Sequence, residues 1–229
     1  MLYVVTSAAP SHAGPVTDLV AGAQAARWRV FVVSTPLGLC FLDRARLEQQ
    51  TGEPVRSEFR MPGEGRELAR ADAVIAAPMT FNTINKWALG ITDNFATGLL
   101  CELTGYGVPI VAVPMLKPAL ARHLAFQNSL HVLRQMGVTL MFDPSAPYER
   151  RMATWDDVLS ELDRATGGTS APRAGASWTL NATSAGASPG SGDGVACHSR
   201  RWWHPPTWSD SADSGFRSTV FRMCSDIPC

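Results

Sequence analysis

Lysine is nearly absent from this chain of 229 residues, because Lys86 and Lys117 are the only two. The formal net charge is zero and no basic run occurs, which argues against nucleic acid or a membrane surface as a partner. No stretch reaches the ~18 consecutive apolar residues that a membrane-spanning helix needs. The start, "MLYVVTSAAP", lacks the basic region of a signal peptide and turns polar early, so we expect a cytoplasmic protein.

Metal-binding patterns are also missing. The chain has five cysteines, but no C-x-x-C pair and no Cys/His cluster at zinc spacing, so we expect no metal site. Cys40 and Cys101 lie in apolar segments, where we expect small buried thiols.

Residues 1–166 do contain a regular alternation of short apolar runs with helical patterns. Uniformly apolar strands are typical of a sheet that is buried on both faces. Alternated with helices, they predict a doubly wound, three-layer α/β fold with a parallel sheet. The predicted strands span residues 2–6, 29–35, 71–78, 109–114 and 138–142. The predicted helices span 15–28, 43–52, the region from the third strand to about 106, 119–137 and 154–166.

The composition changes at residue 167. Residues 167–229 contain no Lys, Glu, Gln or Tyr, are dense in Ser, Gly, Ala and Pro, and hold four of the seven tryptophans. We therefore divide the chain into a domain over residues 1–166 and a low-complexity tail over 167–229. Two origins of the tail stay open: a native disordered segment, or a frame change or non-homologous extension near residue 167.

Small polar side chains follow the third predicted strand. The stretch "ADAVIAAPMTFNTINKWALGITDNF" (71–95) places Thr80, Asn82 and Thr83 directly behind it. Ligands of parallel sheets bind beyond the carboxyl ends of the strands, where the first N–H groups of the next helix favour an anion. Hydroxyl and amide groups there suit a phosphate and its attached sugar alcohol. A cluster of helix N-caps without a ligand is the alternative.

The loops after the first two strands have the same polar character. "TSAAPSHAG" offers Ser7 among small residues, and "STPLGLCFLD" offers Thr35 followed by Phe41. Together the three loops predict a site that holds one phosphate beside an aromatic neighbour for a flat ring. The first loop is not G-x-G-x-x-G, which disfavours a Rossmann dinucleotide site.

These segments resemble a known family, the homo-oligomeric flavin-containing cysteine decarboxylases, which includes phosphopantothenoylcysteine decarboxylase and the lantibiotic peptide decarboxylases. "PMTFNT" (78–83) stands where that family carries its PASANT signature, and "NTINK" and "GITDN" fit the helix after it. "TPLGLCFLD" resembles the T-x-x-A-x-x-F segment, with Gly38 where Ala is usual. The resemblance covers about residues 1–150. It implies a flavodoxin-like (Rossmann-like) sheet, FMN at a subunit interface, and trimers or multiples of trimers.

The resemblance also implies roles for individual residues. Ser7 and Thr35 would bind the FMN phosphate, and Phe41 would lie near the flavin. Asp93 and Asn94 would support the neighbouring loop or the trimer contact. Thr80, Asn82 and Thr83 would contact the phosphate, the ribityl chain or the ring edge. Thr35 and Asp93 as plain helix caps, and Phe41 as plain core, are the alternatives.

The chain departs from the family at its catalytic positions. The family uses a His before the strand that leads into PASANT, whereas here no His occurs between His12 and His123. The family's P-x-M-N signature reads Pro-Met-Leu-Lys at 114–117, so Lys117 replaces the Asn that would hold the substrate carboxylate. Loss of a general base costs ~10²–10⁴-fold in rate, so we expect no useful decarboxylation of cysteine substrates.

We therefore expect an FMN-binding flavoprotein, and an FMN-dependent enzyme that acts on a different small-molecule or peptide substrate. Lys117, Glu64 and Arg66 are the catalytic candidates, with Arg56 as a further residue facing the substrate. A non-catalytic regulatory flavoprotein is the alternative. A flavin prenyltransferase-like role is also open, but the three matched segments follow the cysteine decarboxylases more closely.

Overall fold

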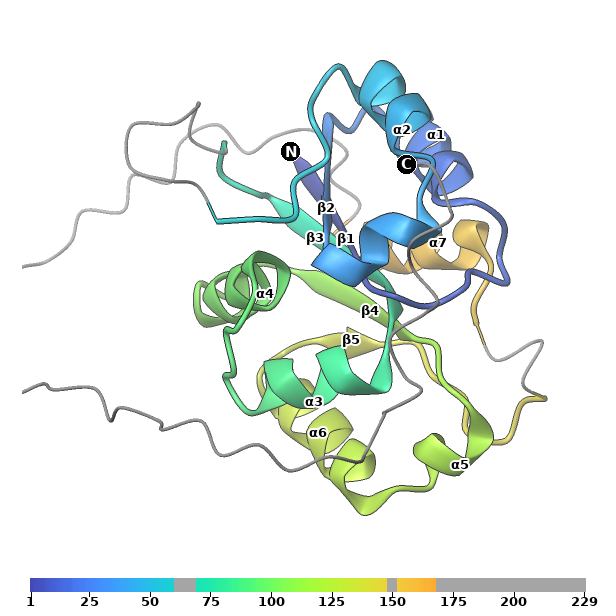
Figure 1. Cartoon of the computed structure of the whole chain (residues 1–229), viewed down its shortest axis with the longest axis vertical. Helices are drawn as coiled ribbons and strands as arrows, with labels where there is room; N and C mark the ends of the chain where they lie inside the picture. Colours follow the sequence, from blue (N-terminus) through green and yellow to red (C-terminus); the bar gives the residue numbers. More distant parts are fainter. Residues whose placement is uncertain (60–68, 148–151, 168–229) are drawn as a thin grey trace, which may run out of the picture. The chain divides into compact units, whose positions relative to one another are not determined.

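The computed structural model describes residues 1–59, 69–147 and 152–167. Five parallel strands form one sheet in the order β2-β1-β3-β4-β5 (Figure 1). They are β1 (Leu2–Thr6), β2 (Val30–Ser34), β3 (Ala73–Met79), β4 (Ile110–Pro114) and β5 (Thr139–Leu140). This is the strand order of flavodoxin-like folds, so the predicted fold class is confirmed.

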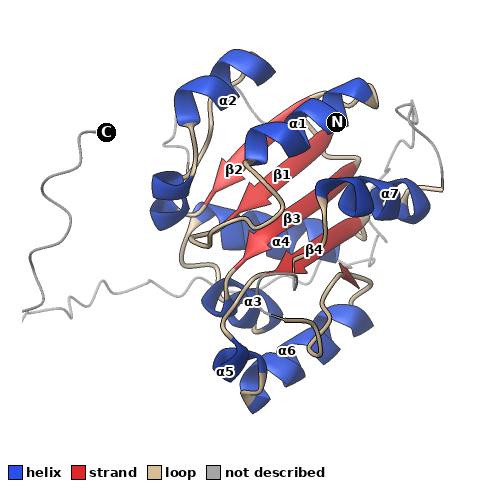
Figure 2. Ribbon diagram, turned by 90° about the vertical axis from the view of Figure 1, so that its right-hand side faces the viewer, coloured by secondary structure: helices blue, strands red, loops and turns tan. Residues whose placement is uncertain are grey.

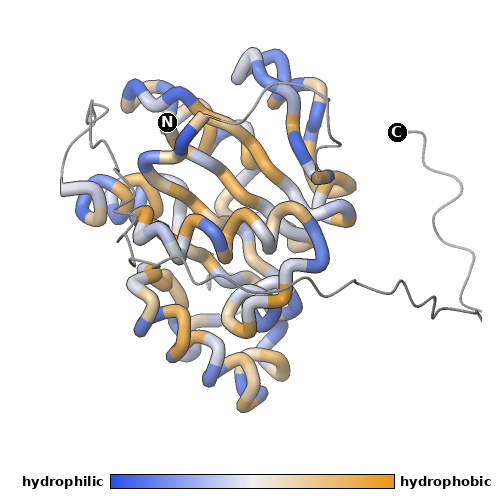
Figure 3. Tube along the Cα trace, turned by 90° about the vertical axis from the view of Figure 1, so that its left-hand side faces the viewer, coloured by the Kyte–Doolittle hydropathy of each residue, from blue (hydrophilic) through white to orange (hydrophobic). Residues whose placement is uncertain are grey.

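The strands are apolar on both sides because helices cover both faces of the sheet. In β1, Leu2 and Val4 pack with α1 (Val16–Ala25), α2 (Arg44–Thr51) and α7 (Trp155–Ala165) on one face of the sheet. Tyr3 and Val5 pack with α3 (Phe81–Ala88), α4 (Phe95–Gly105) and α6 (Leu124–Gln135) on the other face. This alternation follows from the two-residue period of a strand. Figure 2 shows α1 and α7 in front of the sheet and α4 behind it, and Figure 3 shows the strands as hydrophobic segments between mixed helices. The other helical elements of the described residues are α5 (Pro118–Ala121) and a 3₁₀ helix, η1 (Pro36–Phe41).

Local signals in the sequence set most helix ends. Thr154 caps α7 by accepting a hydrogen bond from the Asp157 amide at 3.2 Å. Asp43 caps α2 in the same way, and Gly52 ends α2 in the left-handed conformation at φ +70°.

Three expectations about local structure were wrong. The helix expected over 119–137 is divided into α5 and α6, because His123 leaves the helical conformation and its Nδ1 accepts from the Ala125 amide at 3.1 Å. The last strand is limited to two residues, since β5 is an edge strand that pairs only with β4. Cys40 is exposed, because the segment after β2 forms η1 at the surface, whereas Cys101 is half-buried and burial raises its thiol pKa.

Candidate functional site

The candidate site lies where the chain leaves β1 and β3. From β1 the chain continues to β2, which lies toward one edge of the sheet. From β3 it continues to β4, which lies toward the opposite edge. At such a switch point the loops diverge and leave room for a ligand. Ser7 joins the two loops, because its Oγ donates to the Pro78 carbonyl at 3.0 Å and accepts from the Thr80 amide at 2.8 Å. The adjoining loop is tied to the same edge by the Thr35 amide, which donates to the Thr6 carbonyl at 3.0 Å.

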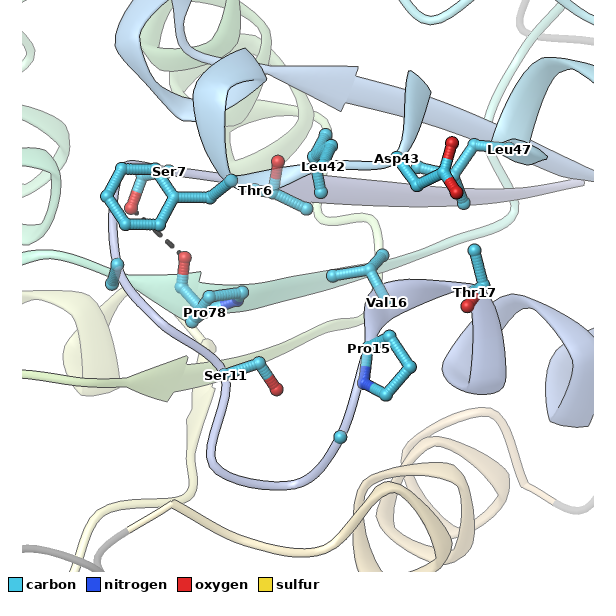
Figure 4. Close-up of a pocket in the computed structure, with 13 residues that line it drawn as sticks. Thr6, Ser7, Ser11, Pro15, Val16, Thr17, Leu42, Asp43, Leu47 and Pro78 are labelled. Atoms are coloured by element: carbon cyan, nitrogen blue, oxygen red, sulfur yellow. Dashed lines mark hydrogen bonds between the residues drawn. The ribbon is translucent and has the colours of Figure 1, made fainter. Parts of the chain in front are cut away.

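A pocket of about 180 Å³ opens beside Ser7 (Figure 4). The loop from β1 to α1 forms one wall, and the end of η1 with the start of α2 forms the other. Its wall is largely apolar, with hydroxyl groups and one carboxylate among the side chains. The side chains that line it include Thr6, Ser7, Ser11, Thr17, Phe41 and Asp43.

Two hydroxyl groups in this wall, Ser11 Oγ and Thr17 Oγ1, are buried without a hydrogen-bond partner among the described residues. Thr17 is only 4% exposed, so water reaches it poorly, and buried polar groups without a partner are rare in proteins. Thr17 also lies in the first turn of α1, where the N-cap residue Pro15 provides no side-chain cap and its carbonyl accepts from the Asp18 amide at 3.0 Å. Figure 4 shows Ser11 on the loop and Thr17 at the start of the helix. The site thus combines hydroxyl donors with the positive end of a helix, as an anion such as phosphate requires.

Asp43 is the one acidic side chain among the described residues of the wall. Its Oδ1 accepts from the Arg46 amide at 3.1 Å, so the carboxylate is already used in part as the cap of α2. A carboxylate oxygen accepts hydrogen bonds from sugar hydroxyls and repels a phosphate. The pocket therefore fits a polyol chain near Asp43 and an anion at the start of α1.

The residues predicted to bind a cofactor divide into two groups. Ser7 and Phe41 line the pocket, and Phe41 is about half exposed rather than core. Thr35 is buried and caps η1, since its Oγ1 accepts from the Gly38 amide at 3.2 Å. Thr80 caps α3 by accepting from the Thr83 amide at 3.2 Å, and the two hydroxyls are 2.9 Å apart. Asn82 is exposed on α3, and neither it nor the two threonines lines the pocket.

Of the three predicted catalytic residues, only Lys117 lies in the described part of the chain. Lys117 is exposed at the N-cap position of α5, just beyond the end of β4. Glu64 and Arg66 lie in 60–68, outside the described residues. The Arg56 backbone extends the sheet edge through a bridge to Val33.

The segment that follows α3 is held by an ion pair rather than by a cap from Asp93. Asp93 pairs with Lys86, which lowers the pKa of the carboxyl group, while Asn94 caps α4 through the Thr97 amide at 3.1 Å. The alternative of Asp93 as a helix cap is therefore wrong.

Gly38 fills a place where no side chain fits. A Cβ there would lie 2.4 Å from Ser34 Oγ, 2.8 Å from Thr35 Oγ1 and 3.2 Å from the Ser7 carbonyl carbon. We expect Gly38→Ala to lower the free energy of unfolding by about 1–3 kcal/mol, because the loops after β1 and β2 must move apart. Urea denaturation measures this. Gly105→Ala, where a Cβ meets nothing within 4 Å, is the control and should be neutral or stabilising; equal effects at both positions would contradict the close approach.

Sequence reasoning missed Ser11 and Thr17. Ser11 lies in the loop after β1 and Thr17 in the first turn of α1, and neither belongs to the segments that carry the family resemblance. Only the buried state of their hydroxyls marks them, and that state depends on η1 and α2 from a later part of the chain.

Two classes of site are absent from the described ranges. No group of three or more His, Cys, Asp or Glu residues there could hold a metal ion. No helix within those ranges has the length and hydropathy to cross a membrane.

Comparison with known proteins gives related sequences and a shared fold. The chain is 30% identical over 135 residues to a phosphopantothenoylcysteine decarboxylase of Arabidopsis thaliana. The aligned region covers 56% of this chain and 62% of that protein. It is 27% identical over 123 residues to the coenzyme A biosynthesis bifunctional protein CoaBC of Thermococcus kodakarensis, covering 52% of this chain and 30% of that protein. The matches thus span less than two thirds of these relatives' length.

Solved structures share the architecture at lower identity. HAL3 from Cryptococcus neoformans is 20% identical with a TM-score of 0.56, covering 74% of this chain and 97% of that one. The FMN-dependent cysteine decarboxylase TvaF from thioviridamide biosynthesis is 23% identical with a TM-score of 0.53, covering 72% and 97%. At these identities the likeness establishes the fold. The model of the Flavoprotein family matches residues 5–167, and the chain therefore belongs to the Flavoprotein family.

Proposed function

We propose that this protein binds FMN at the carboxyl ends of β1 and β3, with the phosphate at the start of α1. The observation that carries the proposal is the pair of buried, unpartnered hydroxyls of Ser11 and Thr17 in the pocket beside Ser7. Membership of the Flavoprotein family and the FMN-dependent neighbours of the same fold support it. When bound, the flavin would supply hydride or electron transfer, and the protein would supply orientation and charge.

Each loop has a separate part in this proposal. Ser11, Thr17 and the first amides of α1 would hold the phosphate, together with Ser7 and Thr35, for which the family resemblance implies the same role. Asp43 would accept hydrogen bonds from the ribityl hydroxyls, and Phe41 would lie against the ring. Thr80, Asn82 and Thr83 would contact the ring edge, which requires the ligand to extend beyond the pocket along the end of β3.

We further propose that the reaction is not cysteine decarboxylation. Lys117 stands in place of an amide side chain and carries donors only, so it cannot reproduce the amide's paired donor and acceptor. His12 and His123 lie outside the segment where the related decarboxylases carry their His.

Incubation of the flavin-loaded protein with phosphopantothenoylcysteine or a cysteine-terminated peptide is expected to release no carbon dioxide above background. A decarboxylase of the same family, assayed alongside, is the positive control. The expected deficit is at least ~10²–10⁴-fold, the usual contribution of one general base. Release at a rate like that of the control would overturn this part of the proposal.

The binding proposal is tested on the purified protein. We expect absorbance at about 450 nm from the oxidised flavin, and a native mass that corresponds to a trimer, or a multiple of trimers, with bound FMN. A folded, colourless protein that takes up no added FMN in a calorimeter would contradict it.

The alternative, a regulatory flavoprotein without an enzymatic reaction, gives the same spectrum as an FMN-dependent enzyme. Only turnover with a substrate distinguishes the enzyme from the regulatory flavoprotein. The cytoplasmic location stays a prediction.

A further inference from the structure

Two side chains from later parts of the chain donate hydrogen bonds to the start of α1. Trp155, the first residue of α7, donates from Nε1 to the Pro15 carbonyl at 3.1 Å, although the two residues are 140 positions apart. Gln50, in the last turn of α2, donates from Nε2 to the Thr17 carbonyl at 3.1 Å. Pro15 and Thr17 both line the pocket, and Figure 4 shows them where the helix begins. Two other helices therefore anchor the turn that forms the proposed anion site.

The Trp155 indole lies behind the pocket wall. It is 6% exposed and belongs to the core cluster that α1 and α7 share. Gly14 lines the pocket, and a Cβ at this glycine would lie 3.8 Å from Trp155 Nε1. The Pro15 carbonyl accepts from both the indole and the Asp18 amide, which its two lone pairs allow. The indole thus fixes the orientation of the peptide group with which α1 starts.

Gln50 carries an unfavourable group beside its hydrogen bond. Its Oε1 is buried without a partner among the described residues, and such acceptors are rare because burying them costs free energy. An apolar side chain of similar length, such as Met, would avoid that cost. The N–H donor of the amide is therefore the part of this side chain that serves the fold, and it contacts the backbone of Thr17. Thr17 is also the residue whose own hydroxyl is left without a partner.

We propose that Trp155 and Gln50 are positioning residues for the anion site, and that they act through the first turn of α1 without touching the ligand. The inference rests on the proposed function, since this turn is where the FMN phosphate would bind. Helix-start amides bind an anion when their N–H groups point to one place, and a turn that is fixed beforehand need not be ordered on binding. Because α7 lies outside the segments that carry the family resemblance, the flavin motifs alone do not contain this part of the site.

The test compares the dissociation constants of FMN and riboflavin for the purified protein, measured by quenching of flavin fluorescence. Riboflavin lacks the phosphate, so the ratio of the two constants reports on the anion site alone. Trp155→Phe keeps most of the apolar volume but loses the donor. It should weaken FMN binding about five- to tenfold, the usual effect of one lost hydrogen bond, and riboflavin binding less than about twofold.

Leu159→Ala is the control in the same helix. Leu159 packs against α1 at Gly22, since a Cβ at that glycine would lie 2.6 Å from Leu159 Cδ1, and Gly22 is more than one turn beyond the start of α1. This variant should lower stability, because it removes packing between α1 and α7, and leave the ratio of the two dissociation constants unchanged. A shift of the ratio as large as that of Trp155→Phe would show a general effect of loosening α7.

Gln50→Met provides an independent measurement, because it removes the unpartnered Oε1 together with the hydrogen bond. The urea midpoint of the flavin-free protein should therefore change little, whereas FMN should bind about three- to tenfold more weakly and riboflavin as before. Gln24→Met is the matched control. Gln24 Nε2 donates to the Gln50 carbonyl at 2.9 Å, between the same two helices but from the last turn of α1, so the ratio should stay at the wild-type value.

The inference is overturned if Trp155→Phe or Gln50→Met leaves the ratio at the wild-type value, or if FMN and riboflavin lose affinity equally. It is also overturned if Leu159→Ala or Gln24→Met shifts the ratio as much as its matched variant. A wild-type protein that binds FMN no more tightly than riboflavin, or takes up neither, defeats the proposed phosphate site and this inference together. A wild-type preference for FMN that both variants retain defeats this inference alone.

Discussion

Ser11→Asp should weaken FMN binding roughly 100-fold or more, because like charges about 4 Å apart at a protein surface repel by up to about 4 kcal/mol. Ser11 Oγ is buried in the pocket wall without a partner, so the new carboxylate would face the place proposed for the phosphate. The dissociation constant of FMN is measured by calorimetry or by quenching of flavin fluorescence.

Matched controls separate charge from shape. Ser11→Asn has nearly the same size as the Asp variant but can donate to a phosphate, and it should bind FMN within about threefold of the wild type. Ser145→Asp adds the same charge on an exposed loop and should have no effect. Riboflavin, which lacks the phosphate, should bind Ser11→Asp and wild-type protein with similar affinity. Equal weakening of FMN and riboflavin would place the phosphate elsewhere.

Trp87→Ala should lower the free energy of unfolding by about 3–5 kcal/mol, a large part of the stability of a domain of this size. Trp87 is 1% exposed on α3, in the core cluster that supports the carboxyl end of β3. Its Nε1 donates to Thr104 Oγ1 at 3.0 Å, so truncation removes a hydrogen bond as well as packing. Urea denaturation without added flavin measures the change at one fixed protein concentration, because ligand and oligomer both shift apparent stability.

Two variants show whether the loss comes from burial. Trp87→Phe keeps most of the apolar volume, and Thr104 Oγ1 retains its bond to the Leu100 carbonyl at 2.7 Å, so the loss should be about 1–2 kcal/mol. Leu89→Ala, at the C-cap of the same helix, removes a side chain that is 72% exposed and should change stability by less than about 0.5 kcal/mol. A Trp87→Ala effect as small as that of Leu89→Ala would contradict the described core.

The strands and most helices were predictable because their signals are local. Short apolar runs marked β1 to β4, and Thr154 marked the start of α7. The break between α5 and α6 was not predictable from apolar spacing, since it depends on the ring of His123 turning back to a backbone amide and packing on Phe81.

The candidate site was only partly predictable for a similar reason. Ser7 and Phe41 were expected in it and line the pocket, whereas Thr35 and Thr80 use their hydroxyls as caps and the Thr83 hydroxyl pairs with that of Thr80. That these three also contact FMN stays a prediction. The sequence alone does not show whether a hydroxyl will cap a helix or will be buried without a partner. Ser11 and Thr17 could therefore not be distinguished from other polar residues of the same segment.

The sequence by itself determined the class of fold and the family resemblance, because apolar periodicity and short motifs are properties of neighbouring residues. The tertiary structure decided which groups meet: Ser7 with Thr80 across 73 positions, and His123 with Phe81. It also decided which hydroxyls are left without a partner, since burial and hydrogen bonding depend on segments that only folding brings together.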